Sequence, residues 1–174
     1  MRIRSYEGGQ QWLIDHHIPL DLNGRYEQWK DSLQARFRIP GDSGFKTGLA
    51  RCLVSELFPE RETIFLVTET DIWPSSEFLY VFLKYRQGHS VDRPLSESEF
   101  HLFGPDEGEA LGGAIALSLY FAWGFLLTDV NLSVIIHASH DEYIECWTRD
   151  PETYKRCDAM FAEYDMERLS GPLP

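Results

Sequence analysis

Cysteine is scarce in this sequence and is not arranged as a framework. The 174 residues contain three cysteines, Cys52, Cys146 and Cys157, which are widely spaced and form no Cys-x-x-Cys pair. Small secreted domains are held together by evenly paired cysteines. The pattern therefore favours reduced thiols and a cytoplasmic protein. The first residues, MRIRSYEGGQQW, have no apolar stretch behind the arginines, so we expect no secretory signal.

Basic residues are scarce in the second part of the chain. Residues 1–93 hold 12 Lys and Arg against 13 Asp and Glu, whereas residues 94–174 hold 4 against 15, so nearly all of the net charge of −12 lies after residue 93. Nucleic-acid binding depends on Lys and Arg that neutralise phosphates. The composition argues against nucleic acid and favours a basic protein partner. The alternative is that the acidic surface only keeps the protein soluble.

Only one long uncharged run is present. Residues 110–128, ALGGAIALSLYFAWGFLLT, carry no charge, and a run of this length could span a bilayer. Three glycines interrupt it, and both flanks are acidic rather than basic. We therefore predict no membrane segment here, but a buried helix over about 107–122 followed by a buried strand.

The chain also lacks repeats, low-complexity tracts and linkers, which predicts a single domain over residues 1–174. With 43% hydrophobic residues it can bury a core without staples. Hydrophobic spacing predicts helices over 24–37 and 45–58, the second with Ser43 as its N-cap, and a final helix that begins at Pro151.

Runs rich in β-branched and aromatic residues predict the strands. ETIFLVTET and EFLYVFLKYR, joined by DIWPSS, are expected to form a hairpin of central strands. A long loop over 88–108 carries a short strand at FHLF, and FLLTD, NLSVIIHA and EYIECWTR supply the remaining strands. The predicted fold class is α+β, with a mainly antiparallel sheet built from two hairpins and helices packed on it.

The loop GDSGFKTG is the nearest approach to a phosphate-binding motif. Only two residues separate Gly41 from Gly44, and Phe45 stands before Lys46, so the spacing of a nucleotide-binding loop is absent. Helix capping accounts for the same residues. We predict no cofactor.

The segment VIIHASHDEYIECWTRD, residues 134–150, concentrates the reactive side chains. A hairpin turn of even length would place Ile136 opposite Glu145 and mix apolar with acidic residues. An odd turn over 139–141 gives one clean apolar face, because one step of register exchanges the two faces. The predicted pairs are Ala138 with Glu142, Ile136 with Ile144, and Val134 with Cys146. Cys146 then points into the core, which argues against a catalytic role for it.

The opposite face of this hairpin is the candidate binding surface. Aromatic side chains beside carboxylates are typical of a surface that recognises a basic protein. The alternative is that the N-terminal segment or the C-terminal helix covers this face and that Glu145 pairs with an arginine. The predicted partner-binding residues are His137, Asp141, Glu142, Tyr143, Glu145 and Trp147.

A metal-dependent hydrolase is the alternative function, with His137, His140 and Asp141 joined by His16 or His17. Adjacent histidines on an extended chain point to opposite sides, and a His-x-x-His spacing at a strand end is poor ligand geometry. We therefore predict no metal ligand and no catalytic residue. A third hypothesis is a homodimer, or a subunit of a larger assembly, that uses the hairpin face as its interface.

LQARFRIPG followed by a helix, then ETIFLVTE, and a last hairpin followed by DPETYKRCDAMFAEYD, resemble a family of uncharacterised bacterial α+β domains. The resemblance covers about residues 29–168. Members look like standalone cytosolic proteins, some encoded in toxin and immunity neighbourhoods, and the resemblance implies no catalytic residue. With the acidic charge, it suggests a protein that binds another protein, as an immunity protein that neutralises a basic toxin would.

Overall fold

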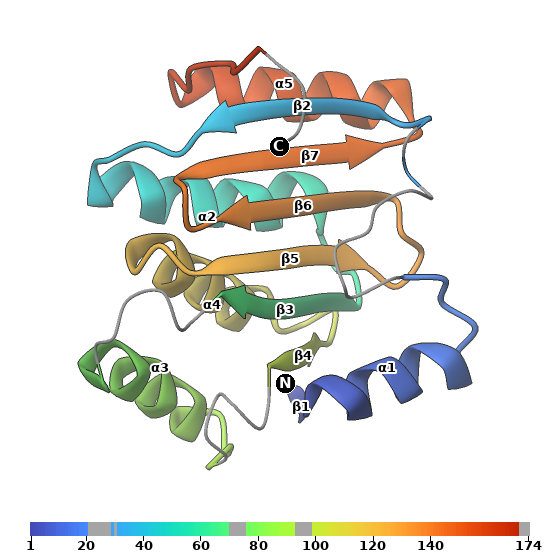
Figure 1. Ribbon diagram of the computed structural model, residues 1–174, viewed down its shortest axis with the longest axis vertical. Coiled ribbons are helices and arrows are strands. Elements are labelled where there is room, and N and C mark those ends of the chain that lie inside the picture. The colour runs from blue at the N-terminus through green and yellow to red at the C-terminus, as the bar shows by residue number, and fades with distance from the viewer. Residues whose placement is uncertain (21–28, 30, 70–75, 93–98, 171–174) are drawn as a thin grey trace.

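The computed structural model describes residues 1–20, 29, 31–69, 76–92 and 99–170. They form a seven-stranded antiparallel sheet with the strand order β1-β4-β3-β5-β6-β7-β2, with helices packed on it (Figure 1). The α+β fold class predicted from the sequence is confirmed. The strands are β1 (Arg2–Arg4), β2 (Leu33–Arg38), β3 (Thr63–Glu69), β4 (Phe100–Phe103), β5 (Gly124–Asp129), β6 (Val134–Ser139) and β7 (Tyr143–Thr148). The helices are α1 (Tyr6–Asp15), α2 (Ser43–Leu57), α3 (Ser76–Gly88), α4 (Gly108–Tyr120) and α5 (Pro151–Glu163).

Two apolar cores lie on the two faces of the sheet. The larger core packs α2, α4 and α5 against one face, and the smaller packs α1 against the other. In Figure 1, α2 and α4 lie behind the sheet. The central strand β3 sends Phe65 and Val67 into the larger core and Ile64 and Leu66 into the smaller one. This explains why its sequence is apolar at consecutive positions.

The predicted helix over 24–37 is wrong for residues 33–37, and residues 24–28 and 30 lie outside the described part of the chain. Residues 33–38 form β2, which pairs with β7 along its whole length, from Leu33 opposite Thr148 to Arg38 opposite Tyr143. Ala35 and Phe37 are buried, at an even spacing. Positions four apart share a face in a helix and also in a strand, so the pattern was ambiguous.

The first predicted hairpin is also wrong, because its second segment forms α3 rather than a strand. Phe82 and Arg86 of this helix are fully buried, while Tyr80 and Val81 are exposed. Burial thus follows the helical spacing of four residues. Aromatic and β-branched residues favour strands only where the sheet offers them a place, and here tertiary packing overrides that preference.

β1 and α1 were not predicted from the sequence, and the remaining elements follow the prediction with two local differences. The N-cap of α2 is Asp42 rather than Ser43: its carboxylate accepts hydrogen bonds from the backbone N–H groups of Gly44 and Phe45, at 2.8 and 3.1 Å. The uncharged run is a buried helix and a buried strand, α4 and β5. Within the described residues, no helix has both the length and the apolar character needed to cross a membrane.

The last hairpin has a turn with an odd number of residues, as predicted, but its strand pairing is shifted by two residues from the predicted pairing. Ser139 pairs with Tyr143 and Ile136 with Cys146, which leaves a three-residue turn over 140–142. Glu142, at φ 60°, occupies the left-handed position that closes such a turn. Because an even shift keeps each side chain on its face, Cys146 points into the larger core as predicted.

Candidate functional site

Five exposed carboxylates gather at one end of the sheet. They come from two regions: the β6–β7 turn, and the C-terminal end of α5 with the segment after it. The end of β2 forms hydrogen bonds with both regions. The Ile39 N–H donates a hydrogen bond to the Glu142 carbonyl at 2.8 Å, and the Arg38 N–H donates one to the Glu167 carbonyl at 2.9 Å. These elements meet at the left of Figure 1. We call the group the acidic end: Asp141, Glu142, Glu163, Asp165 and Glu167.

The segment after α5 lies along the outer edge of β2 and fixes part of the acidic end. Phe37 pairs with Arg168, and the Leu169 N–H donates to the Arg36 carbonyl at 2.9 Å. Met166 is buried and anchors the turn out of the helix. The chain therefore covers this part of its own sheet edge, which would otherwise invite strand pairing.

An aromatic pair joins the first turn of α2 to the acidic end. Phe45 is 50% exposed, and its ring meets that of Tyr164 edge-on at a centroid distance of 6.4 Å. Tyr164 lies between Glu163 and Asp165 in the chain and packs against Gly48, where an added Cβ would come within 3.1 Å of the tyrosine ring. The acidic end thus has an exposed apolar centre, as protein-binding surfaces often do.

Little positive charge offsets the acidic end. Arg38 pairs with Glu167 at 3.0 Å, but both side chains are more than half exposed, so solvent screens the pair. Glu142, Glu163 and Asp165 form no ion pair within the described residues. Burial is the main cause that raises the pKa of Tyr164 above its usual value, and the neighbouring Cys52 thiol and Glu163 carboxylate add to it. Local charge is therefore left unneutralised here.

The hairpin face predicted to bind a partner is partly covered. The Glu145 carboxylate accepts a hydrogen bond from Arg36 Nε at 2.7 Å, and its other oxygen lies 3.3 Å from His137 Nδ1. The Arg36 guanidinium stacks over the Tyr143 ring at 4.4 Å. The alternative considered for the sequence, an arginine on Glu145, is what the structure contains. Sequence reasoning missed Arg36 because it placed that residue in a helix.

Trp147 is also buried. It is 3% exposed and belongs to the smaller core, with Trp12 and Trp29. Of the six predicted residues, only Asp141 and Glu142 are exposed, and His137 and Tyr143 are half-buried. The structure therefore brings His137, Tyr143 and Glu145 together around Arg36, and it separates the exposed turn from the buried indole.

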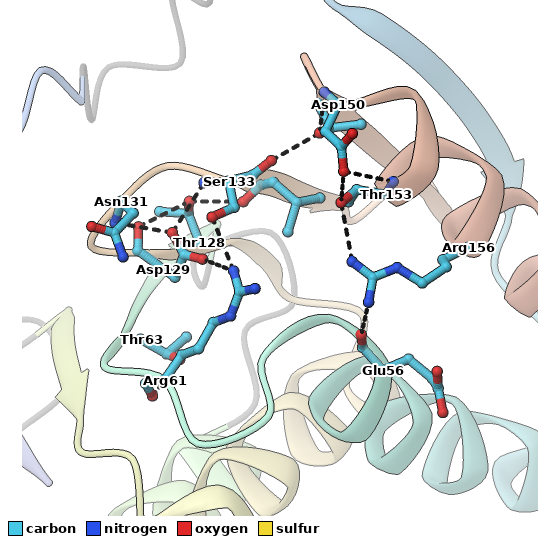
Figure 2. Close-up of polar contacts among 12 residues, drawn as sticks. Glu56, Arg61, Thr63, Thr128, Asp129, Asn131, Ser133, Asp150, Thr153 and Arg156 are labelled. Atoms are coloured by element: carbon cyan, nitrogen blue, oxygen red, sulfur yellow. Dashed lines mark hydrogen bonds and ion pairs between the residues drawn. The ribbon is translucent and has the colours of Figure 1, made fainter.

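A polar network lies at the opposite end of the sheet (Figure 2). Asp129, fully buried, accepts hydrogen bonds from the backbone N–H groups of Asn131 and Ser133, at 2.9 and 3.0 Å, and pairs with Arg61. Arg61 also donates to the Ser133 hydroxyl at 2.9 Å. These bonds lock the β5–β6 turn onto the start of β3. The arrangement is structural, because every described bond of the carboxylate is used to hold backbone or Arg61 in place.

A second part of the same network joins α5 to α2. Asp150 caps α5 by accepting hydrogen bonds from the N–H and hydroxyl groups of Thr153, at 3.0 and 2.7 Å. Arg156 donates to the Thr153 hydroxyl and to the Glu56 carbonyl (Figure 2). The hydrogen bonds from Thr153, with one from the Glu152 N–H, lower the pKa of Asp150 below its usual value.

A buried histidine was not anticipated. His101 on β4 is fully buried among Phe65, Phe82 and Phe103, and its Nδ1–H donates to the Glu99 carbonyl at 2.9 Å. Burial, with the positive charge of Arg86 as a smaller cause, lowers the pKa of His101 to about 3. The imidazole is therefore neutral at physiological pH. No sequence signal marks it, because one histidine in FHLF fits any strand.

His101 should make stability depend on pH. In the unfolded chain a histidine takes up its proton near pH 6.5, whereas folded His101 does so only near pH 3. The unfolded state therefore binds more protons between these values. Stability is complete above about pH 6.5 and falls toward pH 3, by up to about 1.4 kcal/mol per pH unit. We expect His101→Phe to flatten this slope in urea unfolding curves between pH 6.5 and 4.

The control for that measurement is His89→Gln. It changes an exposed histidine that directly follows α3, the helix whose Phe82 packs against His101. It should leave the slope as in the wild type. Equal slopes for the wild type and His101→Phe would contradict a neutral buried imidazole.

The residues of the metal hypothesis do not form one cluster. Within the described residues, no group of three or more His, Cys, Asp and Glu side chains is placed to hold a metal ion. His16 stacks on Trp12 at 4.2 Å, and His140 lies 3.3 Å from Asp141. His16 and His17 line a hollow of about 300 Å³ together with Asn131 and Arg149. A larger hollow of about 640 Å³ lies between α2 and α4, beside Gly108, Gly112 and Gly113 of α4.

Comparison with known proteins returns no relative. No protein-family model matches the chain, and neither the curated proteins nor the solved structures contain a match.

Proposed function

We propose that this protein acts by binding a basic protein through the acidic end, with Phe45 and Tyr164 at the centre of the contact. In its more specific form, the proposal is an immunity protein that neutralises a basic toxin. The observation that carries it is the gathering of exposed carboxylates around the half-exposed Phe45 ring and the partly buried Tyr164 ring, where the ion pair of Arg38 with Glu167 is screened by solvent.

The charge of this surface supports the proposal on physical grounds. Carboxylates crowded on one side repel one another, which lowers the stability of the isolated protein. Arg and Lys side chains of a partner would remove that repulsion and would speed the encounter at low salt. The exposed Phe45 ring would supply the desolvated centre that such contacts need for affinity.

Charge reversal at the acidic end should weaken binding without unfolding the protein. The test variant is Glu142→Lys with Asp165→Lys, and the matched control is Glu7→Lys with Glu56→Lys, which changes the net charge equally on other elements. We expect affinity for the partner to fall at least about ten-fold for the test variant only. Thermal unfolding of both variants checks that they fold.

The partner for this measurement comes from extracts of the source organism, captured on the immobilised wild-type chain and identified by mass spectrometry. Calorimetry with the purified partner then compares the variants at low and high salt. A stoichiometric basic protein, lost with the test variant and weakened by salt, would support the proposal. Retention by both variants, binding insensitive to salt, self-association alone or an acidic partner would each refute it.

A further inference from the structure

Two of the three cysteines face each other in the larger core. Cys146 on β7 and Cys157 on α5 are both fully buried, and their Sγ atoms lie 2.8 Å apart. Both are free thiols in the structure. The third cysteine, Cys52, lies on α2 and is half-buried. Widely spaced cysteines gave no sign of this pairing in the sequence, because only the packing of α5 on β7 brings the two sulfurs together.

The geometry is close to that of a covalent link. A disulfide has a sulfur–sulfur distance of about 2.05 Å, so the two side chains need to move by less than about 1 Å to form one. The bond would join β7, one strand of the last hairpin, to α5, whose C-terminal end contributes to the acidic end. It would also close a short loop, from Cys146 to Cys157, that contains the β7–α5 junction.

We propose that Cys146 and Cys157 are a disulfide-forming pair that fixes α5 to β7 under oxidising conditions. This inference does not depend on the proposed binding function. The oxidant is a small-molecule disulfide such as oxidised glutathione. One protein thiolate attacks it, releases one glutathione thiol and forms a mixed disulfide; the second protein thiolate then attacks the protein sulfur of that mixed disulfide and releases the second glutathione thiol. Two protein thiols are oxidised and one glutathione disulfide is reduced to two thiols.

The rate of this exchange depends on the state of the chain. The neighbouring Cys157 thiol and burial raise the pKa of Cys146 well above its usual value, so the reactive thiolate is rare in the folded protein. Buried sulfurs are also out of reach of the oxidant. The disulfide should therefore form during refolding and far more slowly once α5 has packed.

The experiment refolds the reduced chain in a buffer of reduced and oxidised glutathione, alkylates the remaining thiols and maps the peptides by mass spectrometry. We expect a Cys146–Cys157 disulfide in most molecules, with Cys52 alkylated. The melting temperature of this oxidised form should exceed that of the reduced form by about 5–10 °C, as closure of a loop of this size predicts.

Two variants make the assignment specific. In Cys52→Ala the melting temperatures of the oxidised and reduced forms should differ as much as in the wild type, and in Cys157→Ala they should be equal. If Cys157→Ala does not fold, the comparison of the two wild-type forms still decides. Complete alkylation of Cys146 and Cys157 after refolding, a link to Cys52, or equal melting temperatures of the two forms would overturn the proposal.

Discussion

Replacing Asp129 with alanine is expected to lower the free energy of unfolding by about 3–4 kcal/mol, because hydrogen bonds to a buried charge are worth more than neutral ones. The variant leaves the N–H groups of Asn131 and Ser133 without their acceptor inside the protein. It also removes the partner of Arg61. The loss stays below the sum of three bonds, since the arginine is 37% exposed and can be solvated. Urea unfolding followed by circular dichroism measures it.

Two matched variants divide this effect. Asp129→Asn keeps an oxygen for the two backbone N–H groups, but it replaces the charged oxygen that accepts the Arg61 hydrogen bond with an NH2 group, so we expect a loss of about 1–2 kcal/mol. Arg61→Ala keeps the turn and removes the guanidinium, with a loss of similar size. If Asp129→Ala proves no worse than Asp129→Asn, then the turn hydrogen bonds carry little of the stability and the network in Figure 2 is not a lock.

The errors made from the sequence share one physical cause. Residues 33–37 and 77–86 were assigned by spacing and by residue preference, and each pattern fits both a helix and a strand. Whether each segment forms a helix or a strand is decided by tertiary contacts that no local pattern encodes. Residues 33–38 form a strand because they pair with β7, and α3 forms a helix that buries Phe82. The last hairpin was predicted better, because an apolar face beside a polar one fixes the parity of a register.

The candidate site was predictable only in part for the same reason. Charge counts placed the acidic surplus after residue 93, and strand parity placed Cys146 in the core. Neither could show that the carbonyls of Glu142 and Glu167 both accept hydrogen bonds from the end of β2, since these bonds join residues far apart in the sequence. The partner of Glu145 and the neighbour of Cys157 were likewise set by long-range packing. Proximity in sequence had grouped the exposed turn with the buried indole.

Trp147→Ala separates those two groups and should have the largest effect on stability of any change on the hairpin. The indole is 3% exposed and belongs to the smaller core, so its removal leaves a cavity, and we expect a loss of about 3–5 kcal/mol in the free energy of unfolding. Trp147→Phe, which fills part of that space, should cost clearly less. Denaturant unfolding of the three proteins measures the series.

The decisive comparison is with Phe45→Ala, which removes a half-exposed ring from the acidic end. A surface change of this kind should alter the free energy of unfolding by no more than about 0.5–1 kcal/mol, while partner affinity should fall at least about ten-fold, as for a central aromatic contact. Trp147→Phe should show the reverse: reduced stability with unchanged affinity, because the indole does not reach the surface. Weaker partner binding by folded Trp147→Phe, with Phe45→Ala unaffected, would instead place the recognition surface on the face of the hairpin.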